Sequence, residues 1–121
     1  MTRAQLLQSF VLNSFCDDYE DLEMVYDCVS KDAADCGMPV ERSDILRALT
    51  EGIESGLAQA YRLAVDAEPL QEMPSLEEME TPHTIDYYLT PKGMELHLAY
   101  NDLWPFVEQG ILKDGWTLPT E

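Results

Sequence analysis

Basic residues are scarce in this chain of 121 residues. It contains 7 Lys and Arg against 24 Asp and Glu, which gives a formal net charge of -17 at pH 7. Nucleic acids and anionic membranes are themselves polyanions, so the chain as a whole would be repelled by both. The composition therefore excludes a polybasic nucleic-acid or membrane binder that acts through bulk charge, while a local basic site remains possible.

Long apolar runs are also missing. No segment approaches the roughly 18 consecutive apolar residues of a transmembrane helix. Residues 1–10 carry one Arg, and Gln and Ser interrupt their apolar stretch, so we expect no secretory leader. The number of cysteines is odd. Without a leader, this favours reduced, buried thiols and a cytoplasmic location.

The chain lacks the short motifs of common enzymes and metal sites. It has no phosphate-binding loop, no dinucleotide fingerprint, no H-E-x-x-H and no G-x-S-x-G. We therefore predict no enzymatic activity, no catalytic residue, no cofactor and no bound metal. Two alternatives stay open. One is a zinc site assembled across long separations from Cys28, Cys36, His83 and His97. The other is a small hydrolase in which the two histidines converge with two acids.

What is present is a clear apolar periodicity, with 45% hydrophobic residues. It predicts one domain, 1–121, with a core of about 4–103 and a C-terminal extension of 104–121. The expected fold class is mainly α with a small β-hairpin. Four helices are predicted: over 4–15, from 17–18 to about 32–36, over 41–55, and one that begins at 91. Two strands are predicted over 57–64 and 84–90. Between the strands we expect an acidic loop, 66–83, that can contain one helical turn at 76–79.

Local signals mark several helix ends. Thr2 and Gln5 have the spacing of a capping box. Asp17 and Asp18 are the expected cap of the second helix. Gly56 follows the third helix, where a residue tolerant of positive φ is favoured. Thr90 followed by Pro91 is a strong helix start.

Two segments resemble winged-helix domains of the PadR/MarR kind. The first is Asp44-Ile-Leu-Arg-Ala-Leu-Thr-Glu-Gly-Ile-Glu-Ser-Gly-Leu-Ala, and the second is Tyr87-Tyr-Leu-Thr-Pro-Lys-Gly. The resemblance implies a winged helix-turn-helix fold and a transcriptional regulator. It also implies that helix 41–55 is the recognition helix and that hairpin 57–90 is the wing, which contacts phosphate. It further implies dimers whose terminal helices exchange contacts.

The charges depart from that pattern. Segment 41–55 contains Arg42 and Arg47 but four acidic residues, and loop 66–83 contains six acidic residues and no Lys or Arg. A DNA-binding wing needs cations near phosphates. We therefore predict a non-enzymatic, regulator-like winged-helix module that acts through contacts with another protein. The negative charge favours a partner with a basic surface.

The alternative function is a sequence-specific DNA-binding regulator. It requires Arg3, Arg42, Arg47 and Arg62 to form one positive patch with the carboxylates facing away. Arg42, Arg47 and Arg62 are accordingly the predicted contacts to DNA or to a partner. The simpler interpretation is that Arg42 and Arg47 form surface ion pairs with Glu41, Asp44 or Glu51.

Self-association is the last prediction. Apolar side chains at both ends of the chain suggest a homodimer surface formed by Leu6, Phe10, Tyr100 and Trp104. The competing interpretation is that these residues close one monomeric core. The methionines and tyrosines are a further candidate contact surface, again with burial in the core as the alternative.

Overall fold

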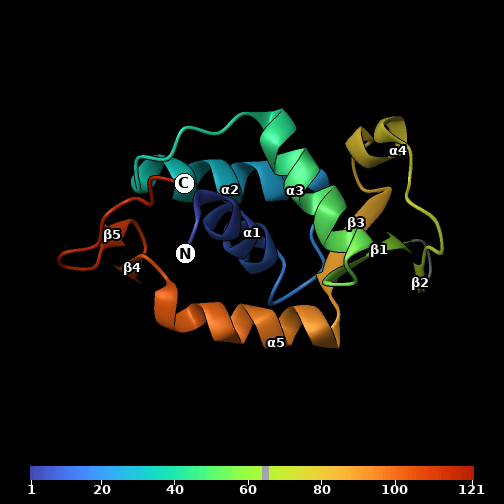
Figure 1. Cartoon of the computed structure of the whole chain (residues 1–121). Coiled ribbons are helices and arrows are strands. Elements are labelled where there is room, and N and C mark those ends of the chain that lie inside the picture. Colours follow the sequence, from blue (N-terminus) through green and yellow to red (C-terminus); the bar gives the residue numbers. More distant parts are fainter. Residues whose placement is uncertain (64–65) are drawn as a thin grey trace.

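The computed structural model describes residues 1–63 and 66–121 (Figure 1). Helices dominate, together with a three-stranded and a two-stranded antiparallel sheet. This agrees with the predicted helix-rich chain with a small β component. The elements in chain order are α1 (Arg3–Ser14), α2 (Leu22–Asp35), α3 (Arg42–Glu54), β1 (Ala58–Leu63), β2 (Ala67–Pro69), α4 (Leu76–Glu80), β3 (Ile85–Leu89), α5 (Pro91–Tyr100), the 3-10 helix η1 (Asn101–Leu103), β4 (Phe106–Glu108) and β5 (Ile111–Leu112).

Helix α1 is the centre of the core. It packs against α2, α3 and α5, which surround it in Figure 1. The predicted capping box is present, since Thr2 Oγ1 accepts a hydrogen bond from Gln5 N at 3.1 Å and Gln5 Oε1 accepts one from Thr2 N at 2.9 Å. Within the described residues, no helix has the length and apolar character needed to cross a membrane. The largest fully buried side chains are Tyr87, Phe10, Phe15, Leu6, Leu12, Leu22, Ile45, Leu49 and Ile85.

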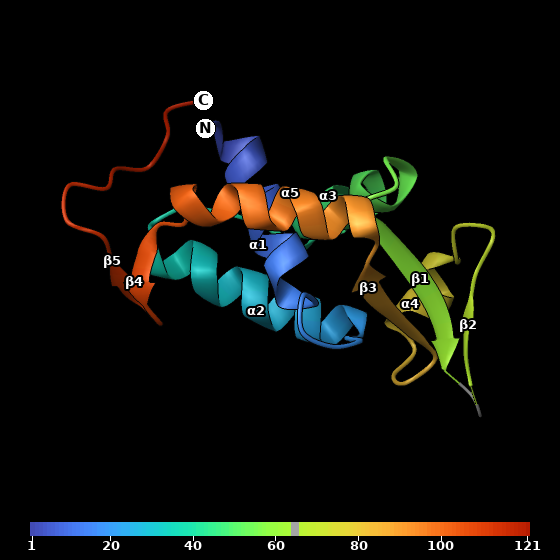
Figure 2. The ribbon, with the colours of Figure 1, turned by 90° about the horizontal axis from the view of Figure 1, so that it is seen from below.

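The three-stranded sheet has the order β2-β1-β3 and lies at one end of the helices, with the β1–β2 hairpin extending away from them (Figure 2). The sequence pattern predicted only two strands. The third, β2, pairs Glu68 with Arg62 of β1 inside the segment expected to be a loop. The helical turn expected in the same segment is present as α4. A strand of three residues, such as β2, carries too little periodicity to be recognised from sequence.

Helix α2 begins later than predicted. Asp21, rather than Asp17 or Asp18, is its N-cap and accepts a hydrogen bond from Met24 N at 2.9 Å. The preceding residue, Glu20, is held in a backbone bridge to β3, with hydrogen bonds of 3.1 and 2.8 Å to Tyr87. A residue committed to a β-bridge has extended backbone, so the helix starts only after it.

The C-terminal segment is part of the core rather than a separate extension. Phe106 is 6% exposed and stacks on Phe10 with ring centroids 6.3 Å apart. The tail then returns to the start of α1, where Arg3 Nε donates to the Pro119 carbonyl at 2.6 Å. The two chain ends lie side by side in Figures 1 and 2. Residues 104–121 therefore stabilise the helices that precede them.

The two segments that carry the family resemblance contact each other. Gly56 ends α3 with φ at +77°, as predicted for a helix terminus. Thr90 is the N-cap of α5, and its hydroxyl donates to the Gly56 carbonyl at 2.6 Å. Lys92 Nζ donates to the Ser55 carbonyl at 2.9 Å. A cation is thus placed at the C-terminus of α3, where the helix dipole favours it.

Candidate functional site

The arginines of α3 and β1 are neutralised by carboxylates. Arg42 Nη2 lies 3.0 Å from Glu23 Oε1 of α2, and Arg62 Nη2 lies 3.1 Å from Glu78 Oε2 of α4. Arg47 Nη1 lies 3.8 Å from Asp44 Oδ1, one turn away on the same helix. Ion pairing was the simpler interpretation for Arg42 and Arg47, and this is the arrangement found, although Glu23 and Glu78 were not foreseen as partners.

The fourth arginine of the DNA-binding alternative lies elsewhere. Arg3 is held by the C-terminal tail, and it shares a shallow groove with Arg47 that is also lined by Asp44 and Glu51. Arg42 lines a different groove, between α2 and α4, together with Glu23 and Glu80. Each groove therefore mixes arginine with carboxylate.

Three tyrosines gather on the outer face of the sheet. Tyr61 lies opposite Asp86, and Tyr88 lies opposite Gln59, in the β1–β3 pairing. Directly paired residues point to the same face, and successive residues alternate. The opposite face carries Ala60, Ile85 and Tyr87, which are buried against the helices. The outer face therefore points away from the core.

Tyr19 joins this cluster from the segment before α2. Its ring centroid lies 5.0 Å from that of Tyr61 at an interplanar angle of 89°, and 4.8 Å from that of Tyr88 at 45°. All three side chains are half-buried. We call the surface formed by Tyr19, Tyr61, Tyr88 and Asp86 the tyrosine face.

Carboxylates crowd this surface. Burial raises the pKa of Asp86, and the charges of Asp21 and Asp18 raise it further, while His83 lowers it. Burial also raises the pKa of Glu20, again reinforced by its acidic neighbours. The pKa of Tyr61 is raised first by burial and then by the hydroxyls of Tyr19 and Tyr88. The tyrosine face is therefore an aromatic surface with concentrated negative charge.

The sequence indicates the tyrosines as a candidate contact surface but does not predict which of them come together. Tyr61 and Tyr88 lie in strands that were predicted, at half-exposed positions. The sequence could therefore indicate that each of them is on the outer side of its strand. Tyr19 was assigned to a helix and instead lies before α2, next to Glu20, which bridges to β3. A cluster that joins three distant segments becomes visible only when the pairing of β1, β3 and residue 20 is known.

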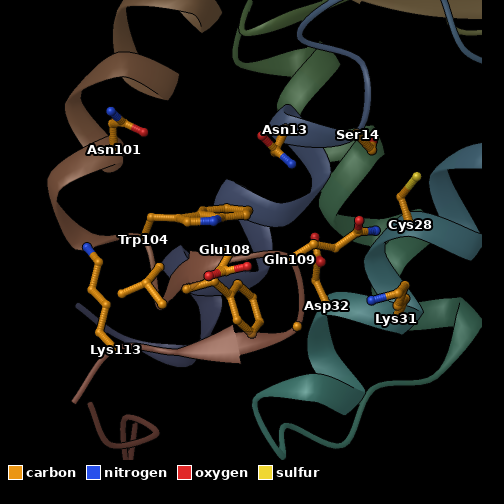
Figure 3. A pocket seen from close by; sticks show the side chains of 13 residues that line it. Asn13, Ser14, Cys28, Lys31, Asp32, Asn101, Trp104, Glu108, Gln109 and Lys113 are labelled. Atoms are coloured by element: carbon orange, nitrogen blue, oxygen red, sulfur yellow. The ribbon is translucent and has the colours of Figure 1, made fainter. Parts of the chain in front are cut away.

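A cavity of about 570 Å³ lies between α2, the end of α1 and the β4–β5 hairpin (Figure 3). Trp104 forms one wall, and Asp32 and Lys31 come from α2. Burial raises the pKa of Asp32 to about 6, an effect that Lys31 opposes and Asp35 reinforces. Burial also raises the pKa of the Cys28 thiol in this cavity, so the thiol is not activated as a nucleophile.

The residues of the metal and hydrolase alternatives are distributed over several elements. His83 precedes β3 and lowers the pKa of Asp86 through its charge, whereas His97 lies on α5 and lines a small cavity with Ser9 and Tyr100. Cys36 is buried at the end of α2, where its Sγ donates to the Ala33 carbonyl at 3.4 Å. Across residues 1–63 and 66–121, no group of three or more His, Cys, Asp and Glu side chains is arranged to hold a metal ion.

The residues predicted for a dimer surface are used within the chain. Leu6 and Phe10 are 0% exposed, which corrects their assignment to a surface. Trp104 packs edge-on against Phe10 at 5.4 Å, and the Tyr100 hydroxyl donates to Gln8 Oε1 at 2.8 Å. Within the chain, Phe10 is covered by Trp104 and Phe106 of the C-terminal segment, whereas Tyr100 and Trp104 stay half-buried. The exposed large apolar residues in this region are instead Leu98, Leu103, Val107, Ile111 and Leu112.

Comparison of the chain with protein-family models, curated proteins and solved structures gives no match.

Proposed function

We propose that the chain is a non-enzymatic, regulator-like winged-helix module that acts by binding a basic protein partner. The observation that carries the proposal is the neutralisation of the arginines at the helix and hairpin that would read DNA. Arg42, Arg47 and Arg62 each face a carboxylate. A carboxylate next to each guanidinium offsets its positive charge and repels an approaching phosphate.

The winged-helix assignment is supported by element order and by one contact. Helices α2 and α3 are joined by a short turn, and the β1–β2 hairpin and β3 follow. The Thr90–Gly56 hydrogen bond links the two segments that resemble the family. Under this assignment α3 is the recognition helix, and the β1–β3 region is the wing.

The charge of the wing supports a protein partner over DNA. Its described residues outside β1 include Glu68, Glu72, Glu77 and Glu80, all of them exposed. Carboxylates on a wing repel phosphates, and the same field attracts a positively charged protein surface and accelerates its association. The alternative, a sequence-specific DNA-binding regulator, would need these groups to point away from the duplex.

The first test is binding to a pool of random duplex DNA at about 20–50 mM salt, where weak phosphate contacts are strengthened. We expect no saturable binding by the wild-type chain. Saturable, salt-sensitive binding that enriches a half-site pattern would overturn the proposal in favour of the DNA regulator. In that case Arg47→Ala should weaken binding more than Lys113→Ala, which removes the same charge outside α3.

A second arm tests the acidic wing directly, with polylysine as the probe. The triple variant Glu68→Gln, Glu72→Gln, Glu80→Gln removes wing charge. The matched control Glu95→Gln, Asp102→Asn, Glu108→Gln removes the same formal charge from α5, η1 and the hairpin. We expect the wing variant to lose more affinity than the control. Equal losses would show that only net charge matters and would contradict a role for the wing.

A further inference from the structure

We propose that the tyrosine face receives an arginine or lysine side chain from the basic partner. This inference rests on the proposed function and assigns the partner's anchoring contact to one surface. The surface is the outer side of the three-stranded sheet, bounded by Tyr19, Tyr61, Tyr88 and Asp86.

The three rings pack against one another, so a cation would lie on their outer surface. Tyr19 touches both other rings, edge-on to Tyr61 and tilted against Tyr88. Each side chain is only half-buried, so aromatic surface remains accessible to a ligand. Cations are attracted to the face of an aromatic ring when they lie within about 6 Å of its centroid. Clusters of aromatic rings are a known way to hold ammonium groups.

The chain already contains one arginine bound in this manner. The Arg42 guanidinium carbon lies 4.6 Å from the centroid of the Tyr26 ring, and the same guanidinium is paired with Glu23. A tyrosine ring and a carboxylate together thus hold one arginine. On the tyrosine face the same two groups recur, since Tyr61 stands directly opposite Asp86.

The electrostatics of this face favour an added positive charge. In addition to burial, the charges of Asp18 and Asp21 raise the pKa values of both Glu20 and Asp86, which shows that these four carboxyl groups lie close together. Arg62 of β1 does not neutralise these carboxylates. It is paired with Glu78 of α4, and as the neighbour of Tyr61 in the strand it points to the other face of the sheet. An external cation would relieve the repulsion among these carboxylates.

The same charges argue against a second copy of the chain as the occupant. Two chains of net charge -17 would bring like charges together at this face. The partner is therefore a protein segment that presents arginine or lysine. Arginine has the advantage of a planar group that can stack on a ring and pair with a carboxylate at once.

The test is titration of the full chain with an oligo-arginine peptide, followed by NMR of the tyrosine ring protons and by calorimetry. We expect saturable binding that shifts the rings of Tyr19, Tyr61 and Tyr88. Tyr61→Leu, which keeps an apolar side chain but removes the ring, should weaken binding about three- to tenfold. Tyr61→Phe keeps the ring and should bind nearly as well as the wild type.

Asp86→Asn tests the carboxylate without removing its bulk, and its charge-matched control is Glu54→Gln on α3. We expect Asp86→Asn to weaken binding more than the control does. Absence of peptide binding, or binding that Tyr61→Leu and Asp86→Asn weaken no more than Glu54→Gln, would overturn the tyrosine face as the anchoring site. If the peptide binds but these two substitutions have no special effect, the proposal of an acidic protein-binding surface still holds and only its location is wrong. Failure of the proposed function itself would be seen separately, as saturable binding of DNA.

Discussion

Gly93 of α5 packs directly on the backbone of Leu57, the residue that leads into β1. A Cβ atom built on Gly93 would lie 1.8 Å from the Leu57 carbonyl oxygen and 2.8 Å from its carbonyl carbon. No side chain fits there without movement of the backbone. Leu57 O also accepts a hydrogen bond from Thr90 N at 3.1 Å. The contact between the start of α5 and the end of α3 therefore depends on this glycine.

Gly93→Ala is expected to destabilise the fold by at least about 2 kcal/mol, because the clash is with backbone and cannot be relieved by a side-chain rotation. Urea unfolding measures this change. The control is Gly52→Ala in the interior of α3, where an added Cβ meets nothing within 4 Å. Alanine should stabilise the helix there by about 0.5–1 kcal/mol. Similar effects of the two substitutions would show that the close contact at Gly93 does not exist.

Thr90→Ala should cost about 1–2 kcal/mol of stability. The substitution removes both the cap of α5, where Thr90 Oγ1 accepts from Gly93 N at 3.0 Å, and the hydrogen bond to the Gly56 carbonyl. Thr90→Ser keeps the hydroxyl and should restore most of the loss. Thermal unfolding of the three proteins distinguishes the outcomes, and a serine variant as unstable as the alanine variant would contradict the hydrogen-bonding role.

Tyr87→Phe is expected to stabilise the protein by about 1 kcal/mol. The Tyr87 hydroxyl is buried and has no hydrogen-bond partner among the described residues. Burial raises the pKa of this phenol, and the nearby Tyr26 raises it further. Leaving a buried polar group unpaired costs free energy that removal of the group recovers. A loss of stability in urea unfolding would instead indicate that the hydroxyl is satisfied in solution.

Asp32 should make stability depend on pH. Its pKa is raised from 3.8 to about 6 by burial, so the folded chain binds this proton more tightly than the unfolded chain. The stabilisation by protonated Asp32 is complete below pH 3.8 and is lost as the pH rises through about 6.

Asp32→Asn should therefore gain stability relative to the wild type between about pH 4 and pH 7. Because the side chain keeps partial contact with water, we expect a gain of about 1–2 kcal/mol. The exposed Asp27→Asn on the same helix is the control. The measurement is urea unfolding of all three proteins across this pH range, and a difference between Asp32→Asn and wild type that stays constant with pH would contradict the assignment.

The ends of several helices could be predicted because their signals lie within one turn of the chain. Thr2 with Gln5, Gly56 and Thr90 with Pro91 all act where they were expected. The start of α2 was missed because the cap at Asp21 depends on a bridge between Glu20 and Tyr87. That bridge joins residues far apart in the sequence, so no local sequence pattern predicts it.

The same distinction applies to the candidate sites. The scarcity of cations and the acidity of residues 66–83 follow from the sequence alone, and they are the reason for proposing a protein partner rather than DNA. The pairing of Arg42 with Glu23 and of Arg62 with Glu78 could not be foreseen, since each pair joins different elements. Neither could the cluster of Tyr19, Tyr61 and Tyr88.

The amino-acid sequence by itself determined the helix-rich class, the principal helices and the strong negative charge, because these depend on residue type and on spacing within a few positions. Only the tertiary structure decided which apolar stripes are core. Phe10 is covered in part by Trp104 and Phe106 of the C-terminal segment, and Leu6 is buried on the same helix, which α2, α3 and α5 surround. It also decided which tyrosines share a face, since strand register, not sequence distance, sets the neighbours across a sheet.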